Sequence, residues 1–188
     1  MRVKEFKVET CSRNDIKDFI ETNHYSGNIN GCISTYCFRL LYEDTLIGAA
    51  FFGKLAMANQ WKRFGESIDD VIELRRLVCI DETPKNTESY FIGKMLKWLK
   101  QNTNHKIVVS YADAEFGHSG VIYKASNFKY LGFRKGARVI IWNNKRYHDK
   151  SLRAPKPYAS KLKQALEKGE AYYKETKGKH TYTYQLKL

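Results

Sequence analysis

The sequence has no long hydrophobic run, and its longest apolar segment, residues 46–53, is far too short to cross a bilayer. The first residues, MRVKE, do not have the apolar core of a secretory signal peptide. We therefore expect neither a membrane span nor secretion, and we predict a cytoplasmic protein that does not bind membranes.

Proline and glycine are scarce as well, with 3 and 12 of the 188 residues, which excludes a collagen-like or low-complexity chain. The four cysteines are Cys11, Cys32, Cys37 and Cys79. None of them forms a Cys-x-x-Cys pair, so we expect free thiols in a reducing compartment rather than a zinc site. The length suits one domain with a single sizeable core.

Acidic residues are too few to balance the basic ones: 20 Asp and Glu face 33 Lys and Arg, a net charge of +13. A surplus of this size indicates a polyanionic partner, most often nucleic acid. Residues 145–188 hold 12 Lys and Arg against 4 Asp and Glu, together with 6 of the 13 tyrosines. Basic residues interleaved with aromatics suit a phosphate backbone and unstacked bases, with Lys161, Lys163 and Lys168 as candidate contacts. A solvated helix whose tyrosines pack on the domain is the alternative.

Apolar periodicity predicts a mixed α/β fold, with a central twisted sheet flanked by helices. The expected strands are 3–8, the hairpin of 35–42 and 45–52, 71–80, 106–111, and 130–133 continued at 138–142. The expected helices are 12–23, capped by Ser12 with Asp15, a helix from residue 87, and a short helix at 120–127. The helix from residue 87 should have one apolar face, made of Phe91, Ile92, Met95, Leu96 and Leu99. We divide the chain into a domain at 1–144 and a basic, tyrosine-rich extension at 145–188 packed on it. The extension is expected to hold a basic helix at 158–173 and an edge strand at 181–188.

From Val71 onward this order resembles the GNAT acyltransferase fold, in which a helix N-terminus receives the pyrophosphate of coenzyme A. Unpaired backbone amides and the helix dipole favour a phosphate at such a position. The corresponding segment, TPKNTES at 83–89, supplies Lys85 and the hydroxyl of Ser89. It lacks the glycines of the usual Arg/Gln-x-x-Gly-x-Gly/Ala loop, and an ordinary capped helix start explains the same residues.

Four separated motifs carry a closer resemblance: HYSG at 24–27, ELRRL at 73–77, VSYADAEFGHSGVIYKASNFKYLGF at 109–133 and KHTYTY at 179–184. In this order they are similar to the bacteriophage Mom family, divergent GNAT members that modify adenine in DNA. The resemblance runs from about residue 20 to the C-terminus. It implies conversion of the N6 amine of adenine to a methylcarbamoyl (acetamido) derivative, which protects phage DNA from host restriction in the cytoplasm of the host.

The family's functional positions fall on six residues of this sequence: His24, Tyr25, Arg76, Ser89, Asp113 and Tyr123. Asp113 ends a buried strand, at the edge of a parallel sheet where ligands bind, and Tyr123 follows on the next helix. An Asp and a Tyr that converge at this edge are candidates for base and acid on the amine. We expect Arg76 and Ser89 to bind the donor, with Lys85 of the same loop as a further contact beside the helix start. Acetyl-coenzyme A is the implied donor. A bound iron is also implied, with His24, Tyr25 and Asp113 as candidate ligands and His118 as an addition.

Each of these side chains also has a structural interpretation. The alternatives are a helix cap for Asp113, a core position for Tyr123, a polar loop position for His24, and an ion pair with Glu73 or Asp81 for Arg76. Arg75 competes with Arg76, because only one of two successive strand residues faces a given side.

Two other functions fit the sequence: a GNAT N-acetyltransferase with another amine acceptor, and a noncatalytic nucleic-acid-binding module on a GNAT-like scaffold. The net charge of +13 favours an enzyme acting on DNA, because an acetyltransferase of small molecules does not need it. The target adenine would have to be flipped out of the duplex or single-stranded.

Overall fold

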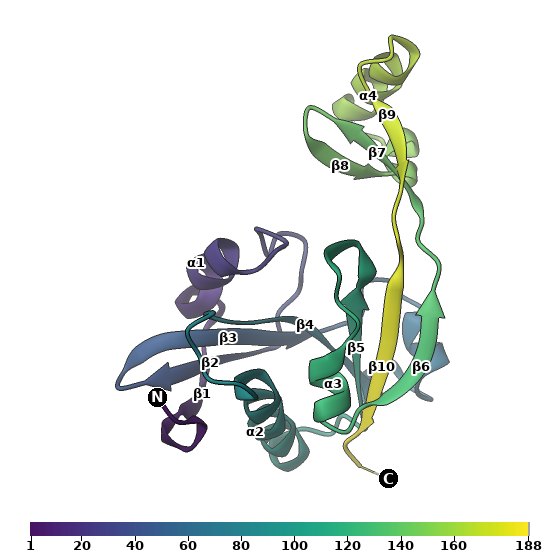
Figure 1. The fold of residues 1–188 in the computed structure, drawn as a ribbon. Helices are drawn as coiled ribbons and strands as arrows, with labels where there is room; N and C mark the ends of the chain where they lie inside the picture. Colours follow the sequence, from purple (N-terminus) through teal and green to yellow (C-terminus); the bar gives the residue numbers. More distant parts are fainter. Residues whose placement is uncertain (188) are drawn as a thin grey trace.

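The computed structural model describes residues 1–187 and contains a large sheet and a small one (Figure 1). The large sheet has seven strands in the order β1-β2-β3-β4-β5-β10-β6. Their bounds are Lys7–Cys11 (β1), Tyr36–Tyr42 (β2), Thr45–Gly53 (β3), Val71–Cys79 (β4), Ile107–Asp113 (β5), Lys179–Gln185 (β10) and Lys129–Arg134 (β6). Only β4 and β5 pair in parallel, and the other neighbours are antiparallel. The predicted mixed α/β fold is confirmed.

Helices cover both faces of this sheet (Figure 1). Helix α1 (Arg13–Asn23) buries Ile16 and Ile20 on one face, and α2 (Thr87–Asn102) packs on the other face beside α3 (Val121–Ala125). Five short 3-10 helices lie in the connections: η1 (Val3–Glu5), η2 (Gln60–Arg63), η3 (Ile68–Asp70), η4 (Ala114–Phe116) and η5 (Asp149–Arg153). Among the described residues, no helix is both long and apolar enough to span a membrane.

The sequence patterns that begin and orient these helices are present as predicted. The hydroxyl of Ser12 accepts from the N–H of Asp15 at 3.3 Å, and the Asp15 carboxylate accepts from the N–H of Ser12 at 2.8 Å. This reciprocal pair satisfies two backbone donors that the first turn of α1 leaves free. The five apolar residues expected on one face of α2 are all buried in the main core. All four cysteines are free thiols.

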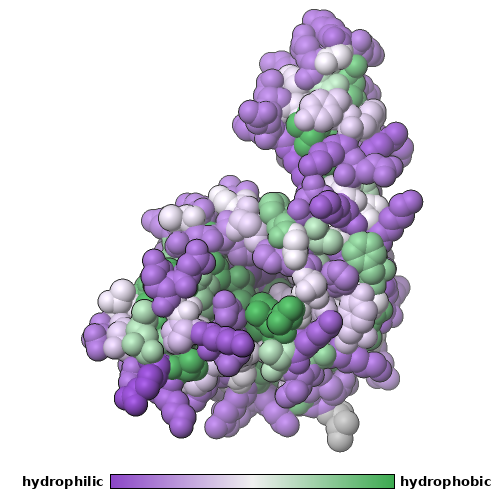
Figure 2. Space-filling model, viewed as in Figure 1, coloured by the Kyte–Doolittle hydropathy of each residue, from purple (hydrophilic) through white to green (hydrophobic). Residues whose placement is uncertain are grey.

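Residues 138–175 form a second, smaller unit, which we call the arm (Figure 1). It consists of a sheet in the order β8-β7-β9 and of helix α4, with bounds Arg138–Trp142 (β7), Lys145–His148 (β8), Pro157–Glu167 (α4) and Tyr172–Glu175 (β9). Its small core includes Ile140, Leu162 and Ala171. Most of its surface in view is hydrophilic (Figure 2). A boundary at residue 144 would pass through the β7–β8 hairpin, so we place this unit at 138–175.

Two expectations for the chain after residue 145 are wrong. The basic helix ends at Glu167, followed by Gly169 with φ +74° and by β9. The segment predicted as an edge strand forms β10, which lies inside the large sheet between β5 and β6, while Leu188 lies outside the described residues. Alternating apolar and polar residues show which face of a strand is buried, but not whether the strand has one neighbour or two. β10 has two neighbours, so it is an inner strand. Similarly, 130–133 and 138–142 belong to different sheets.

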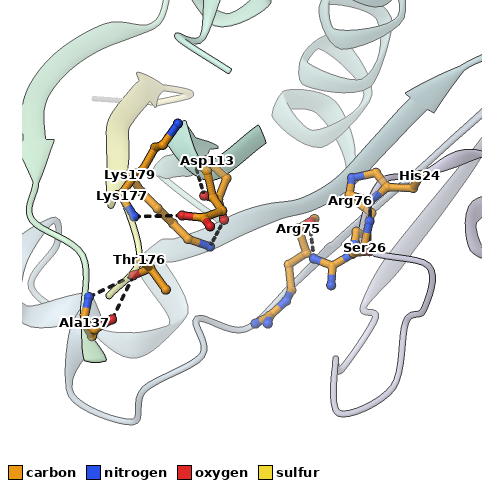
Figure 3. A network of polar contacts seen from close by, with 10 residues as sticks. His24, Ser26, Arg75, Arg76, Asp113, Ala137, Thr176, Lys177 and Lys179 are labelled. Carbon is orange, nitrogen blue, oxygen red and sulfur yellow. Dashed lines mark hydrogen bonds and ion pairs between the residues drawn. The ribbon is translucent and has the colours of Figure 1, made fainter. Parts of the chain in front are cut away.

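The two segments that join the arm to the main sheet are fixed to each other. The hydroxyl of Thr176 accepts from the N–H of Ala137 and donates to its carbonyl, both at 3.0 Å (Figure 3). Gly136 and Gly178 allow this close approach, because a Cβ at either residue would lie within 2.2 Å of a backbone oxygen of the opposite segment. The N–H of Lys177 also donates to Glu115 at 2.9 Å. The arm is therefore held in a defined position at the edge of the sheet.

Gly120→Ala should destabilise the fold, because Gly120 has φ +81° and an added Cβ would lie 2.3 Å from the ring of the fully buried Tyr182. That ring cannot withdraw easily, since its hydroxyl donates to the carbonyl of Ser119 at 2.6 Å. Gly117→Ala is the matched control, with φ +76° and nothing within 4 Å. In urea unfolding, Gly120→Ala should lose about 1–3 kcal/mol more than Gly117→Ala, the usual cost of overpacking. Equal losses would contradict this packing.

Candidate active site

The site lies where the two parallel strands separate. β4 and β5 pair from Val71 with Ile107 to Leu74 with Ser110, and no further. Beyond this point the remainder of β4 pairs with β3, and the remainder of β5 pairs with β10. The sheet therefore opens at the carboxyl ends of its two central strands, where open α/β sheets bind ligands.

A β-bulge on β4 changes which side chains face this opening. Phe51 of β3 pairs with Arg76 and Phe52 pairs with Leu74, so Arg75 is an extra residue without a partner on β3. A bulge places two successive side chains on one side of the strand. Arg75 and Arg76 are both among the residues that line the opening, and the guanidinium of Arg75 donates to the carbonyl of Lys54 at 2.7 Å.

A cleft of about 470 Å³ occupies the opening and brings together most of the predicted site residues. It is lined by His24 and Tyr25 after α1, by Arg76 of β4, by Asp113 at the end of β5 and by Tyr123 of α3. These residues come from four separate parts of the chain. Figure 2 shows this face hollowed between α1 and α3.

Asp113 is 6% exposed and makes two polar contacts. One oxygen accepts from the N–H of Glu115 at 3.1 Å, so the predicted capping interaction is present. The other oxygen forms an ion pair with Nζ of Lys179, at 3.1 Å across the β5–β10 register (Figure 3). One oxygen of the carboxylate is thus held by the backbone and the other by the half-exposed side chain of Lys179.

Tyr123 lies in the core and also lines the cleft. Its ring packs against Phe128 and Tyr182, with centroids 5.5 Å and 5.3 Å away. Burial raises the pKa of its hydroxyl to about 12, so the phenol keeps its proton at neutral pH. Such a group can donate a proton but is not a base.

His24 and Tyr25 form one side of an aromatic cluster at the cleft. The rings of His24 and Tyr25 stack with centroids 4.1 Å apart, and Tyr25 also contacts Phe116 at 4.3 Å and His118 at 5.0 Å. Nδ1 of His24 accepts from the N–H of Ser26 at 3.1 Å. Burial, followed by the charge of Arg76, lowers the pKa of His24 to about 4. The imidazole is therefore neutral at physiological pH.

The residues implied as iron ligands, His24, Tyr25 and Asp113, all line the cleft, and the rings of the first two are stacked. Across residues 1–187, no group of three or more His, Cys, Asp or Glu side chains is placed to hold a metal. We derive no step through iron.

The residues at the start of α2 that were predicted to bind the donor molecule do not gather around the cleft. Lys85 is exposed and does not line the cleft, and the hydroxyl of Ser89 donates to the carbonyl of Asn86 at 3.0 Å. The carboxylates of Asp81 and Glu88 line the cleft instead. These two carboxylates disfavour a diphosphate at this end of the cleft, while Arg75 and Arg76 favour an anion further along it.

A second cavity, of about 750 Å³, adjoins the cleft and shares Arg75, Arg76, Tyr111 and Asp113 with it. Sequence reasoning missed this cavity and three side chains in its wall, Gln60, Glu73 and Tyr111. Glu73 lies in the ELRRL motif and Tyr111 in the motif at 109–133, whereas Gln60 lies outside all four motifs. Lys161 and Lys163 of α4 and Lys168, which follows its last residue, line neither cavity.

The model of the Mom protein family matches residues 5–188. This chain belongs to the Mom family. It is 29% identical over 157 residues to the methylcarbamoylase Mom of Escherichia phage Mu, an alignment that covers 81% of this chain. The chain spans 64% of the length of that relative.

Solved structures with the same fold are N-acetyltransferases. NAA60 of Arabidopsis thaliana in complex with acetyl-CoA matches with a TM-score of 0.59 at 10% identity, covering 96% of this chain and 98% of that chain. The spermidine/spermine N-acetyltransferase SpeG of Vibrio cholerae matches with a TM-score of 0.57 at 12% identity, covering 98% and 94%. At these identities the likeness shows the GNAT fold for this Mom family member and nothing about its substrate.

The neutral state of His24 makes the stability of this Mom family member depend on pH. The unfolded imidazole titrates near 6.5 and the folded one near 4, so the unfolded state binds more protons between these values. The free energy of unfolding should be highest above pH 6.5 and should fall as the pH drops towards 4. Urea unfolding of wild type and His24→Asn across pH 4–8 measures this, because the difference between the two isolates His24. A difference that does not change with pH would show that His24 protonates freely in the folded protein.

Proposed function

We propose that this chain is a DNA-modifying transferase that attaches a methylcarbamoyl (acetamido) group to the N6 amine of adenine and so protects DNA from restriction. The observation that carries this proposal is the meeting of Asp113, Tyr123 and Arg76 in one cleft at the opening between β4 and β5. The Mom family match and the net charge of +13 support DNA as the substrate.

In the proposed reaction, the N6 nitrogen attacks an electrophilic carbon of the donor. A bond forms between nitrogen and carbon, and the bond from that carbon to the leaving group breaks. The Asp113 carboxylate takes the proton that N6 loses, and the Tyr123 hydroxyl gives its proton to the leaving group. Lys179 keeps the carboxylate beside the cleft, and the high pKa of Tyr123 keeps its proton available.

For the donor we propose a small activated molecule in the cleft, with an anionic group bound by Arg76. The guanidinium donates one hydrogen bond to the carbonyl of Arg75, at 2.7 Å, and its Nε has no partner among the described residues. Acetyl-coenzyme A, which the fold suggests, meets Asp81 and Glu88 at the start of α2. These carboxylates oppose binding of its diphosphate.

Transfer to a free polyamine fits the structure less well. The second cavity has Arg75, Arg76, Arg134, Lys135, Arg146 and Lys179 in its wall, against two carboxylates. A polycation would be repelled there, whereas a polyanion would be attracted. The same argument favours a nucleic acid over the amine of a basic protein.

Asp113→Asn and Tyr123→Phe should each lower the rate of adenine modification by about 10²–10⁴-fold, the usual effect of losing a positioned base or acid. Both changes preserve shape, so the fold should persist. The measurement is mass spectrometry of nucleosides from the DNA of a bacterium that expresses each variant.

Tyr184→Phe is the control, because it removes the hydroxyl of another half-buried tyrosine that lines neither cavity. Modification at the wild-type rate by both site variants would reject the assigned roles. Binding of DNA without any modified base in the wild type would instead support the noncatalytic alternative.

The affinity for acetyl-coenzyme A, measured by calorimetry, should show how each charged side chain around the cleft affects its binding. Glu88→Gln should bind it several-fold more tightly than wild type, because one carboxylate no longer faces the diphosphate. Arg76→Ala should weaken binding by about 1.5–3 kcal/mol, or roughly ten- to 150-fold. Lys85→Gln is the control and should bind like wild type, since Lys85 lies outside the cleft. Weaker binding by Lys85→Gln with no change in Glu88→Gln would place the diphosphate at the helix start after all.

A further inference from the structure

The second cavity lies between the main sheet and the arm. Its wall is built from β4 and β5, from the segment that holds η2, and from the two segments that lead into and out of the arm. Arg134 and Lys135 come from the segment entering the arm, Arg146 from β8, and Lys179 from the start of β10. A chain lying across this junction would contact both units at once.

The two adjoining cavities differ in charge. The second cavity has six basic side chains and two carboxylates, Glu73 and Asp113. The cleft has Arg75 and Arg76 against three carboxylates, which include Asp81 and Glu88. A phosphate backbone is therefore attracted to the second cavity rather than to the cleft.

Buried polar atoms without a partner gather in the wall of the second cavity. Six buried side-chain nitrogen and oxygen atoms have no hydrogen-bond partner among residues 1–187, and four of them belong to Gln60, Glu73, Arg75 and Arg76. Gln60 and Glu73 are each 9% exposed. Glu73 Oε2 lies 3.7 Å from Nη1 of Arg75, in an ion pair, and a polar ligand would reach the unpartnered atoms after a small movement of these side chains.

Gln60 is held in a definite orientation. Its Nε2 donates to the hydroxyl of Tyr111 at 2.5 Å, which leaves Oε1 as a free acceptor. Burial raises the pKa of that hydroxyl to about 12, so Tyr111 stays protonated. An acceptor fixed in this way matches a donor such as the exocyclic amine of adenine, which glutamine recognises in DNA grooves.

We propose that the second cavity receives the target nucleotide of DNA, with Gln60 accepting a hydrogen bond from the base and Arg134, Lys135 and Arg146 binding the neighbouring phosphates. This rests on the proposed function and extends it by assigning the face from which DNA enters. The base would then reach Asp113, which both cavities share, while the donor occupies the cleft. The lysines of α4, which the sequence favoured, are not needed for this contact.

The phosphate contacts are tested by the affinity for a single-stranded oligonucleotide at several salt concentrations, measured by fluorescence anisotropy without any donor. The variant Arg134→Gln, Lys135→Gln, Arg146→Gln should reduce the slope of log affinity against log salt by about two, at about 0.7 per phosphate contact in single strands. A matched variant removes three exposed lysines of α2, Lys94, Lys97 and Lys100, and should retain at least most of the slope. Lys161→Gln, Lys163→Gln, Lys168→Gln tests the α4 lysines.

Equal losses of slope in the cavity and α2 variants would overturn the phosphate assignment, because total charge alone would then explain binding. A larger loss in the α4 variant would overturn it too, in favour of the lysines predicted from the sequence.

The base contact is tested with two oligonucleotides that differ at one position, adenine or purine without the exocyclic amine. Wild type should prefer adenine by about three- to tenfold, the usual scale of one hydrogen bond, and Gln60→Leu should lose that preference. Gln60→Met replaces it if the leucine variant does not fold. A wild type without preference, or a Gln60 variant that keeps it, would overturn base recognition by Gln60. These readouts need no catalysis, so failure of the proposed reaction and failure of this inference are distinguishable.

Discussion

The separation of β4 from β5 after Leu74 and Ser110 determines the rest of the site. Beyond this point each strand stays hydrogen-bonded on its other side, β4 to β3 and β5 to β10, while the backbone groups that face the opening have no strand partner there. The insertion of β10 between β5 and β6 makes this possible, because without it the end of β5 would be an exposed edge. The C-terminal strand is therefore a structural requirement for the cleft.

Local patterns of the sequence predicted the local structure well. The apolar stripe of α2 and the Ser12 cap of α1 appear as expected, because helix faces and caps depend on residues within one or two turns. The candidate residues in the motifs HYSG and SYAD also lie in the cleft. They could be predicted because these motifs resemble those of a known family. Their roles in catalysis are still proposals.

The features that sequence reasoning missed depend on contacts between distant residues. The bulge at Arg75 arises from the pairing register between β3 and β4, so it cannot be predicted from the two arginines alone. The pattern of alternating apolar residues in β10 does not show which strands lie beside it in the sheet. Gln60 is oriented by Tyr111, which lies 51 residues away in the sequence. Net charge predicted a polyanionic partner, but composition could not show where the cations gather.

The position of Asp113 explains why the two cavities are useful together. Its carboxylate stands at the end of β5, in the walls of both, and Lys179 reaches it from the side of the second cavity. A donor held by Arg76 and a base held by Gln60 would approach this carboxylate from different directions, so neither needs to leave before the other binds. The charges support the same division, because the carboxylates of the cleft repel phosphates that the second cavity attracts. In the proposed arrangement, a DNA strand would be kept out of the space that the donor needs, while its target base would still reach Asp113.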